Sequence, residues 1–272
     1  MKDQTGTGRC IYAIVLALTL LMVTNICLAQ QAASSLVSQG EQSPVIEKEA
    51  TDALVRMGKF LQTLKTFEVS AQISIDEVLD SGQKIMTNGT SQMTVNRPYQ
   101  VRAEIKVDEI DKDLQFVYDG KTFTLYGNKN KYYASQDIPG TIGKMTDVIS
   151  DRHDIEFPLG DLFVWGTDKA GLDNIQEAFS IASTRIGGVL CDHYAFRQAD
   201  VDWQIWIQKG DTPLPIKLVI TTKLEEGSPQ HISVLKWNLS PVIEDKLFVF
   251  VPPKGSYKIK FAKVETATEN TN

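Results

Sequence analysis

The sequence predicts a mainly β protein of the α+β class, in which one long N-terminal helix precedes a single, strongly curved antiparallel sheet of about eleven strands. Apolar residues recur every three or four positions over 46–65, and apolar and polar residues alternate through most of the chain that follows. The first pattern is typical of an amphipathic helix and the second of half-buried strands. Helical segments do not alternate with the strand-like ones, which excludes a doubly wound parallel sheet.

The N-terminal helix is predicted over 46–65 and has about five turns. Its opposite face is charged or polar, with Glu49 and Lys59 among its residues. An apolar stripe of this kind has to pack on another apolar surface. The stripe consists of Ala50, Ala53, Leu54, Met57, Phe60, Leu61 and Leu64.

The strands are predicted from alternation and from turn residues between the alternating runs. Asp80-Ser81-Gly82 is predicted to be a turn. Asp119-Gly120 is predicted to be a two-residue hairpin turn, because Asp-Gly pairs adopt the positive φ angles that short hairpins need. The predicted strands cover 69–76, 84–96, 101–107, 114–118, 123–125, 132–136, 180–185, 190–197, 201–208, 214–223, 231–239 and 247–251.

Two short helices are predicted over 141–165, where the alternation stops and helical spacing returns. We expect the long helix and these two to cover the concave face of a sheet close to half a barrel. Helices of this size would leave an apolar cavity, although its lining could equally be filled core. The expected lining is Leu54, Met57, Leu61, Ile73, Ile105, Phe116, Tyr118, Phe123, Ile142, Met145, Phe163, Trp203 and Ile205.

The first 29 residues have the parts of a secretory signal peptide. Lys2 and Arg9 give it a positive start, 11–23 is apolar, and small residues lead up to Ala29. An uncleaved anchor is the alternative, but the apolar run is shorter than the roughly 20 residues that a spanning helix needs. We therefore expect a periplasmic protein with a signal peptide at 1–29, a flexible tether at 30–44, one folded domain at 45–262 and a disordered tail at 263–272.

Charge and cysteine content limit the partners. The chain has 28 Lys and Arg against 34 Asp and Glu, so it lacks the basic field that holds phosphate backbones and we expect no nucleic acid partner. Cleavage of the signal peptide would leave Cys191 as the only thiol, and one cysteine cannot form an intramolecular disulfide. We expect a monomer that is not an integral membrane protein.

Sequence motifs for catalysis or metal binding are not found. Cys191 and His193 share one side of a predicted strand, and a thiolate–imidazole pair is the alternative to a buried thiol beside a surface histidine. Asp151, His153 and Asp154 have no known metal-site spacing, and a solvated helix end explains them better. We expect no catalytic residue, no metal and no cofactor.

Three sequence segments carry a resemblance to a known group of proteins. They are 116–126, the pair 202–207 and 214–218, and 248–253. The layout resembles the periplasmic lipoprotein carriers of the LolA and LolB type, the N-terminal part of the RseB sensor and mycobacterial lipid carriers, and within that group a family of predicted periplasmic proteins. The resemblance implies an apolar cavity for acyl chains. Arg97 and Arg102 lie near the position of the carriers' lipoprotein-handling arginine, and no motif favours either.

The expected function is that of a non-catalytic periplasmic carrier or chaperone that binds a lipid, an acyl chain or a lipidated protein. The alternative is a sensor or regulatory module that uses the same fold with a membrane-associated partner protein. A third hypothesis, an enzyme with dispersed carboxylates, has no supporting spacing in the sequence.

Overall fold

In the computed structural model, residues 44–262 are described. The predicted signal peptide, the predicted tether up to residue 43 and the predicted tail at 263–272 lie outside this range. These three assignments therefore stay predictions.

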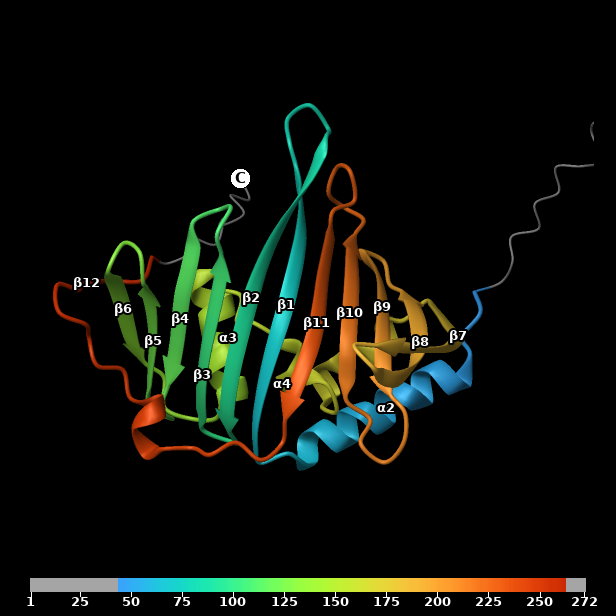
Figure 1. Cartoon of the computed structure of the whole chain (residues 1–272), viewed down its shortest axis with the longest axis horizontal. Coiled ribbons are helices and arrows are strands. Elements are labelled where there is room, and N and C mark those ends of the chain that lie inside the picture. The colour runs from blue at the N-terminus through green and yellow to red at the C-terminus, as the bar shows by residue number, and fades with distance from the viewer. Residues whose placement is uncertain (1–43, 263–272) are drawn as a thin grey trace, which may run out of the picture. The chain divides into compact units, whose positions relative to one another are not determined.

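The described chain forms one curled, unclosed sheet of twelve strands (Figure 1). The strand order is β12-β6-β5-β4-β3-β2-β1-β11-β10-β9-β8-β7, so β1 and β11 join the first and second halves of the chain at the middle of the sheet. The strands are β1 (Thr66–Val78), β2 (Lys84–Asn96), β3 (Gln100–Val107), β4 (Lys112–Tyr118), β5 (Thr122–Gly127), β6 (Tyr132–Asp137), β7 (Glu177–Ile186), β8 (Val189–Arg197), β9 (Val201–Gln208), β10 (Pro215–Thr222), β11 (Gln230–Asn238) and β12 (Tyr257–Ile259).

Helix α2 (Lys48–Thr63) buries the predicted apolar stripe against the sheet. The chain before it is tied to the start of β7, because the Ala178 N–H donates to the Val45 carbonyl at 2.9 Å and the Glu47 N–H donates to the Ala178 carbonyl at 2.9 Å. The helix therefore starts at one edge of the sheet and runs toward its centre (Figure 1).

The inserted helices are α3 (Ile142–His153) and α4 (Asp161–Val164), followed by the short 3-10 helices η1 (Asp168–Ala170) and η2 (Leu172–Asn174). Thr141 caps α3, since its Oγ1 accepts a hydrogen bond from the Lys144 N–H at 3.3 Å. The Tyr118 hydroxyl lies 2.7 Å from the carbonyl oxygens of both Ile138 and Gly140 and fixes the approach to α3 against β4.

The two faces of the sheet differ in polarity. Val69, Ala71 and Ile73 of β1 are buried, whereas the alternating Gln72 is exposed. Successive side chains of a strand point to opposite faces, and the buried set packs in one core cluster with side chains of α2, α3 and α4. All three helices thus cover the same face, which lies behind the strands in Figure 1. We call the other one the open face.

The predicted architecture is confirmed: the chain is mainly β, with a single curled sheet, a long N-terminal helix and short inserted helices. The predicted strand at 247–251 is wrong, because this segment contains the 3-10 helix η3 (Asp245–Phe248) and pairs with no strand of the described chain. Phe248 is buried and Phe250 packs on Tyr126 and Tyr133. The alternation therefore reflects a segment lying across the open face. Strand β12, which the sequence pattern did not indicate, pairs with β6 in parallel.

Candidate functional site

The residues predicted to line a cavity lie in the core between the sheet and the helices. All of them except Trp203 are buried members of the core cluster, and Trp203 is partly buried and packs against it. Phe116, for example, contacts Phe123 and Phe157, with ring centroids 6.4 and 5.4 Å apart. The structure brings the predicted residues together as one packed core, and their role in ligand binding stays a prediction.

The helical layer over this core is closely packed. A Cβ atom on Gly58 of α2 would lie 2.5 Å from the Gly166 nitrogen, so a glycine is needed where the two backbones meet. The Gln62 side chain donates to the Trp165 carbonyl at 2.7 Å. These contacts join α2 to the segment that follows α4.

Arg97, in the connection between β2 and β3, joins this helical layer to the sheet. Its Nη2 donates to the Leu162 carbonyl at 2.9 Å and its Nη1 to the Gln62 Oε1 at 3.4 Å. The guanidinium carbon lies 5.2 Å from the Phe163 ring centroid and 5.8 Å from that of Phe67. It forms no ion pair within residues 44–262, and its Nε is buried without a hydrogen-bond partner there. Burial lowers the pKa of Arg97.

Arg102, the second arginine that the resemblance indicates, lies on the other face of the sheet. Arg102 pairs with Glu104 at 3.1 Å, and its Nη1 donates to the Leu247 carbonyl at 3.4 Å. Both contacts are on the open face, away from α2, α3 and α4. Of the two arginines, only Arg97 contacts the helical layer.

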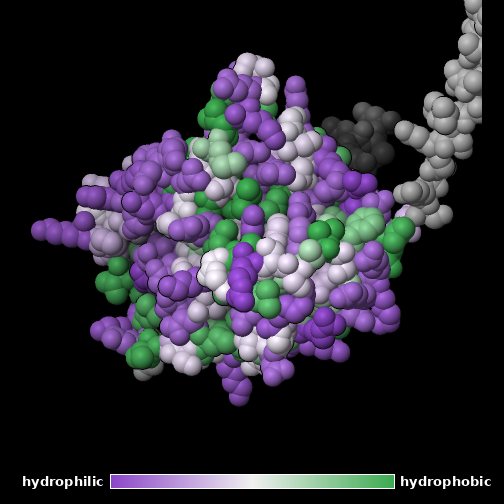
Figure 2. All heavy atoms as spheres, turned by 45° about the vertical axis from the view of Figure 1, so that its right-hand side comes forward, coloured by the Kyte–Doolittle hydropathy of each residue, from purple (hydrophilic) through white to green (hydrophobic). Residues whose placement is uncertain are grey.

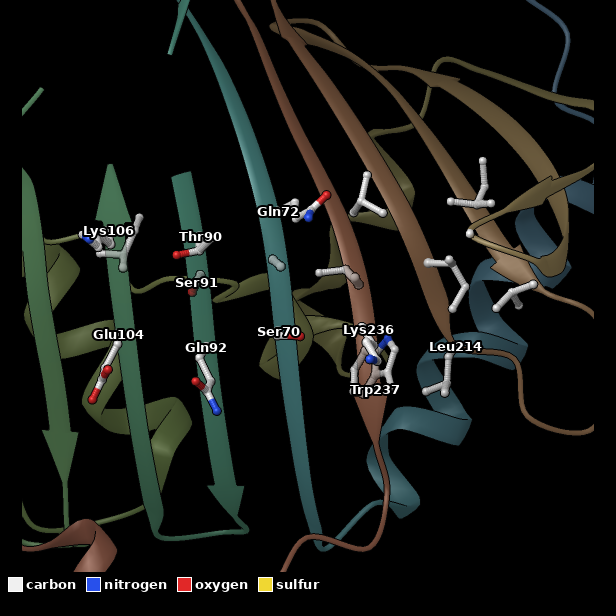
Figure 3. Close-up of a pocket in the computed structure, with 18 of the residues that line it drawn as sticks. Ser70, Gln72, Thr90, Ser91, Gln92, Glu104, Lys106, Leu214, Lys236 and Trp237 are labelled. Atoms are coloured by element: carbon white, nitrogen blue, oxygen red, sulfur yellow. The ribbon is translucent and has the colours of Figure 1, made fainter. Parts of the chain in front are cut away.

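A pocket of about 1050 Å³ crosses the open face (Figure 3). No residue of α2, α3 or α4 lines it, and in Figure 3 the helices lie behind the strands that carry its lining. Figure 2 shows the outer surface, where hydrophobic side chains gather between hydrophilic ones below the projecting β1–β2 hairpin. Of the residues predicted to line a cavity, only Ile105 borders this pocket.

The lining of the pocket changes in character along the sheet. The side formed by β7 to β10, with the adjoining end of β11, is mainly apolar, and the side formed by β1 to β4 is mainly polar. The apolar part contains Ile186, Val189, Leu214, Ile216, Val234, Leu235, Trp237 and Leu239, and the polar part contains Ser70, Gln72, Thr90, Ser91, Gln92, Glu104, Lys106, Asp113 and, after β5, Asn128. Lys236 lies on β11 between Leu235 and Trp237, and so on the apolar side.

Several polar groups of the pocket are held by neighbours. The Gln92 side chain donates to Glu68 at 3.1 Å, and the Asn128 amide donates to Asp113 at 2.5 Å. Lys236 is exposed and forms no ion pair with any residue of the described range. The pocket therefore keeps a free ammonium group for a ligand.

The cysteine and histidine of β8 lie on the open face, and the two side chains have different partners. Cys191 is fully buried, and burial raises the pKa of its thiol, which keeps it protonated at neutral pH. His193 stacks on Trp206 with ring centroids 4.0 Å apart, and Lys217 Nζ lies 4.6 Å from the Trp206 ring centroid on β9. Burial, and then the charge of Lys217, lower the pKa of His193. Trp206 is therefore covered by the side chains of His193 and Lys217.

The other histidines also have structural partners. His153 lies 2.6 Å from the Gln136 side chain and 2.6 Å from the Ala262 carbonyl, and so links α3 to β6 and to the end of the described chain. His231 lies 3.0 Å from the Ser233 hydroxyl, and burial lowers its pKa. Within residues 44–262, no group of three or more His, Cys, Asp and Glu side chains could hold a metal ion.

The sequence patterns missed the open-face pocket because they assign that face to solvent. Gln72, Gln92 and Lys236 occupy the polar positions of alternating strands, which predicts exposure and nothing more. The apolar part depends on the β7–β8 turn reaching the β9–β10 connection and the end of β11. No local pattern in the sequence encodes that contact.

The solved structures that are similar to this chain include three that are covered over nearly their whole length. LprF from Mycobacterium bovis is 12% identical, with 73% of this chain and 97% of that chain covered and a TM-score of 0.45. LppX from Mycobacterium tuberculosis is 10% identical, with 72% and 98% covered and a TM-score of 0.43. The LolA superfamily protein NE2245 from Nitrosomonas europaea is 10% identical, with 74% and 97% covered and a TM-score of 0.35. No curated protein matches the chain.

The family assignment rests on most of the folded region. Residues 50–262 match a family described as "Predicted periplasmic protein (DUF2092)". Among the described residues, no helix is both long enough and apolar enough to span a membrane. The match begins inside α2 and ends at the last described residue, so that it takes in the whole sheet. The chain therefore belongs to the predicted periplasmic protein family DUF2092.

Proposed function

We propose that this protein is a non-catalytic periplasmic carrier that binds an amphiphile, either a lipid or an acylated protein, in the open-face pocket. The observation that carries the proposal is the pocket's lining, which is apolar at one end and polar at the other. An amphiphile would place its acyl chain beside Val189 and Leu214 and its polar part beside Thr90 and Gln92.

The size of the pocket fits such a ligand. Its volume of about 1050 Å³ is at the upper end of the range of roughly 300 to 1000 Å³ for small-molecule sites. Burial of an acyl chain contributes about 0.8 kcal/mol per methylene. Binding therefore needs no covalent chemistry.

The acyl chain could also bind in the core under the helices, which is the location that the sequence predicts. Access to that core requires α2 and α4 to move away from the sheet, and Arg97 holds them through Gln62 and the Leu162 carbonyl. The two locations make different predictions for substitutions on the open face.

The test is the binding of a dansyl-labelled fatty acid to two matched variants. Val189→Glu puts a charge in the apolar part of the pocket, whereas Leu190→Glu, on the next residue of β8, puts the same charge on a side chain that is 40% exposed and outside the lining. Because loss of a buried valine contact costs about 1.5 kcal/mol or more, we expect Val189→Glu to raise the Kd at least about tenfold and Leu190→Glu to leave it within about twofold.

The other outcomes separate the alternatives. Normal binding by Val189→Glu would contradict the open-face site and leave the core under the helices as the location. If the wild-type protein binds neither the labelled fatty acid nor a labelled phospholipid, the carrier proposal fails. The regulatory-module hypothesis would then lead.

A further inference from the structure

We propose that the sheet edge at β6 and β12, together with the segment leading to β12, is a docking surface for a membrane that contains anionic lipids. We call this surface the basic edge, and define it as residues 129–136 and 249–262. It lies on the opposite edge of the sheet from β7 (Figure 1). The inference goes beyond the proposed function, because it does not depend on what the protein carries.

The charge of the basic edge is opposite to that of the chain as a whole. The two segments contain Lys129, Lys131, Lys254, Lys258 and Lys260 and no Asp or Glu, in a chain with a formal net charge of -6. Lys129 pairs with Asp111, and the other four form no ion pair within the described residues. β6 itself ends at the exposed Asp137, next to this surface, so the lysines outnumber the carboxylates at the edge. A surface with unpaired lysines in such an excess is complementary to an anionic bilayer.

Apolar and aromatic side chains are exposed between these lysines. Val251 is 75% exposed and Tyr257 64% exposed, and Val249, Ile259 and Tyr132 are exposed as well. Tyrosine is a common side chain at the membrane interface, where its ring contacts the acyl boundary and its hydroxyl the headgroups. Lysine and interfacial tyrosine side by side favour a lipid surface over a purely polar partner.

The basic edge is held in place by the fold. The Tyr257 N–H donates to the Lys131 carbonyl at 2.9 Å, and the Tyr132 and Tyr257 rings lie 5.9 Å apart. Phe261, near the end of the surface, stacks on Phe123 with ring centroids 5.7 Å apart. The lysines and exposed apolar side chains therefore project from an ordered support.

Lysines on an edge strand also prevent that edge from pairing with another sheet. This explains Lys258 and Lys260, which lie in or next to β12. It does not explain Lys254, Val249 and Val251, which lie outside the strand and are exposed. Membrane docking accounts for both groups of residues.

The experiment is co-sedimentation of the mature protein with phosphatidylcholine vesicles, with and without phosphatidylglycerol. We compare the wild type with Lys258→Glu/Lys260→Glu and with the control Lys59→Glu/Lys65→Glu, which makes the same charge change at exposed lysines of and after α2. Each lysine near an anionic surface favours binding by about fivefold. We therefore expect the basic-edge variant to lose at least about tenfold in partitioning, and the control to stay within about twofold.

Four results would overturn the proposal. They are no binding of the wild type to phosphatidylglycerol vesicles, equal binding to both vesicle types, normal binding of the basic-edge variant, and equal losses in the two variants. Circular dichroism and the Tm of each variant establish that the fold is intact. Val251→Ser serves as a second variant, since it leaves the charge unchanged and is expected to weaken binding through loss of apolar contact alone.

Discussion

Gly58→Ala should lower the free energy of unfolding by about 2 kcal/mol, although alanine is the better helix former. The added Cβ would lie 2.5 Å from the Gly166 nitrogen and 2.8 Å from its Cα. Both are backbone atoms, so that either α2 or the segment after α4 has to shift. Chemical denaturation of the mature protein measures the loss.

The control for this prediction is Gly143→Ala in α3. Its Cβ would meet only the Thr141 Oγ1, at 4.0 Å, so that helix propensity should act alone and stabilise the protein by about 0.5 kcal/mol. If both substitutions stabilise the protein, α2 and the chain around Gly166 are not in close contact. The account of a joined helical layer would then be wrong.

Arg97→Ala should lower the free energy of unfolding by about 2 kcal/mol, because it removes the charged donor that joins the helices to the sheet. The Leu162 carbonyl loses its partner at 2.9 Å, and the Phe67 and Phe163 rings lose their contact with the cation. Hydrogen exchange at α4 should rise in the same variant.

Arg102→Ala is the matched control, because its ion pair with Glu104 is on the open face. Exposed pairs contribute about 0 to 1 kcal/mol, and exchange at α4 should not change. Equal destabilisation by the two substitutions, with unchanged exchange at α4, would show that Arg97 does not hold the helical layer.

The fold could be predicted from the sequence wherever a strand has one buried face and one exposed face, because the sequence then alternates between apolar and polar residues. The alternation in 101–107 gives the bounds of β3 to within one residue, since Val101, Ala103, Ile105 and Val107 are buried and the residues between them are not. The same rule failed at 247–251, where Phe248 and Phe250 are covered by the open face of the sheet rather than by a neighbouring strand. Local alternation does not distinguish these two causes of burial.

The candidate site could be predicted only in part. Arg97 was one of two arginines that the resemblance brought forward, and only the packing of Gln62, Leu162 and Phe163 around it distinguishes it from Arg102. The open-face pocket depends on the twist of the whole sheet, which brings Val189 toward the end of β11. Such long-range curvature is not written in any single stretch of sequence.

The central claim is that the protein carries an amphiphile, and native mass spectrometry tests it most directly. The mature protein is purified from periplasm without detergent, and any bound molecule is then extracted into organic solvent and identified. The account predicts a mass excess that resolves into a phospholipid, a fatty acid or a lipidated peptide. A protein that carries no added mass, and gains none after incubation with lipids, would contradict it.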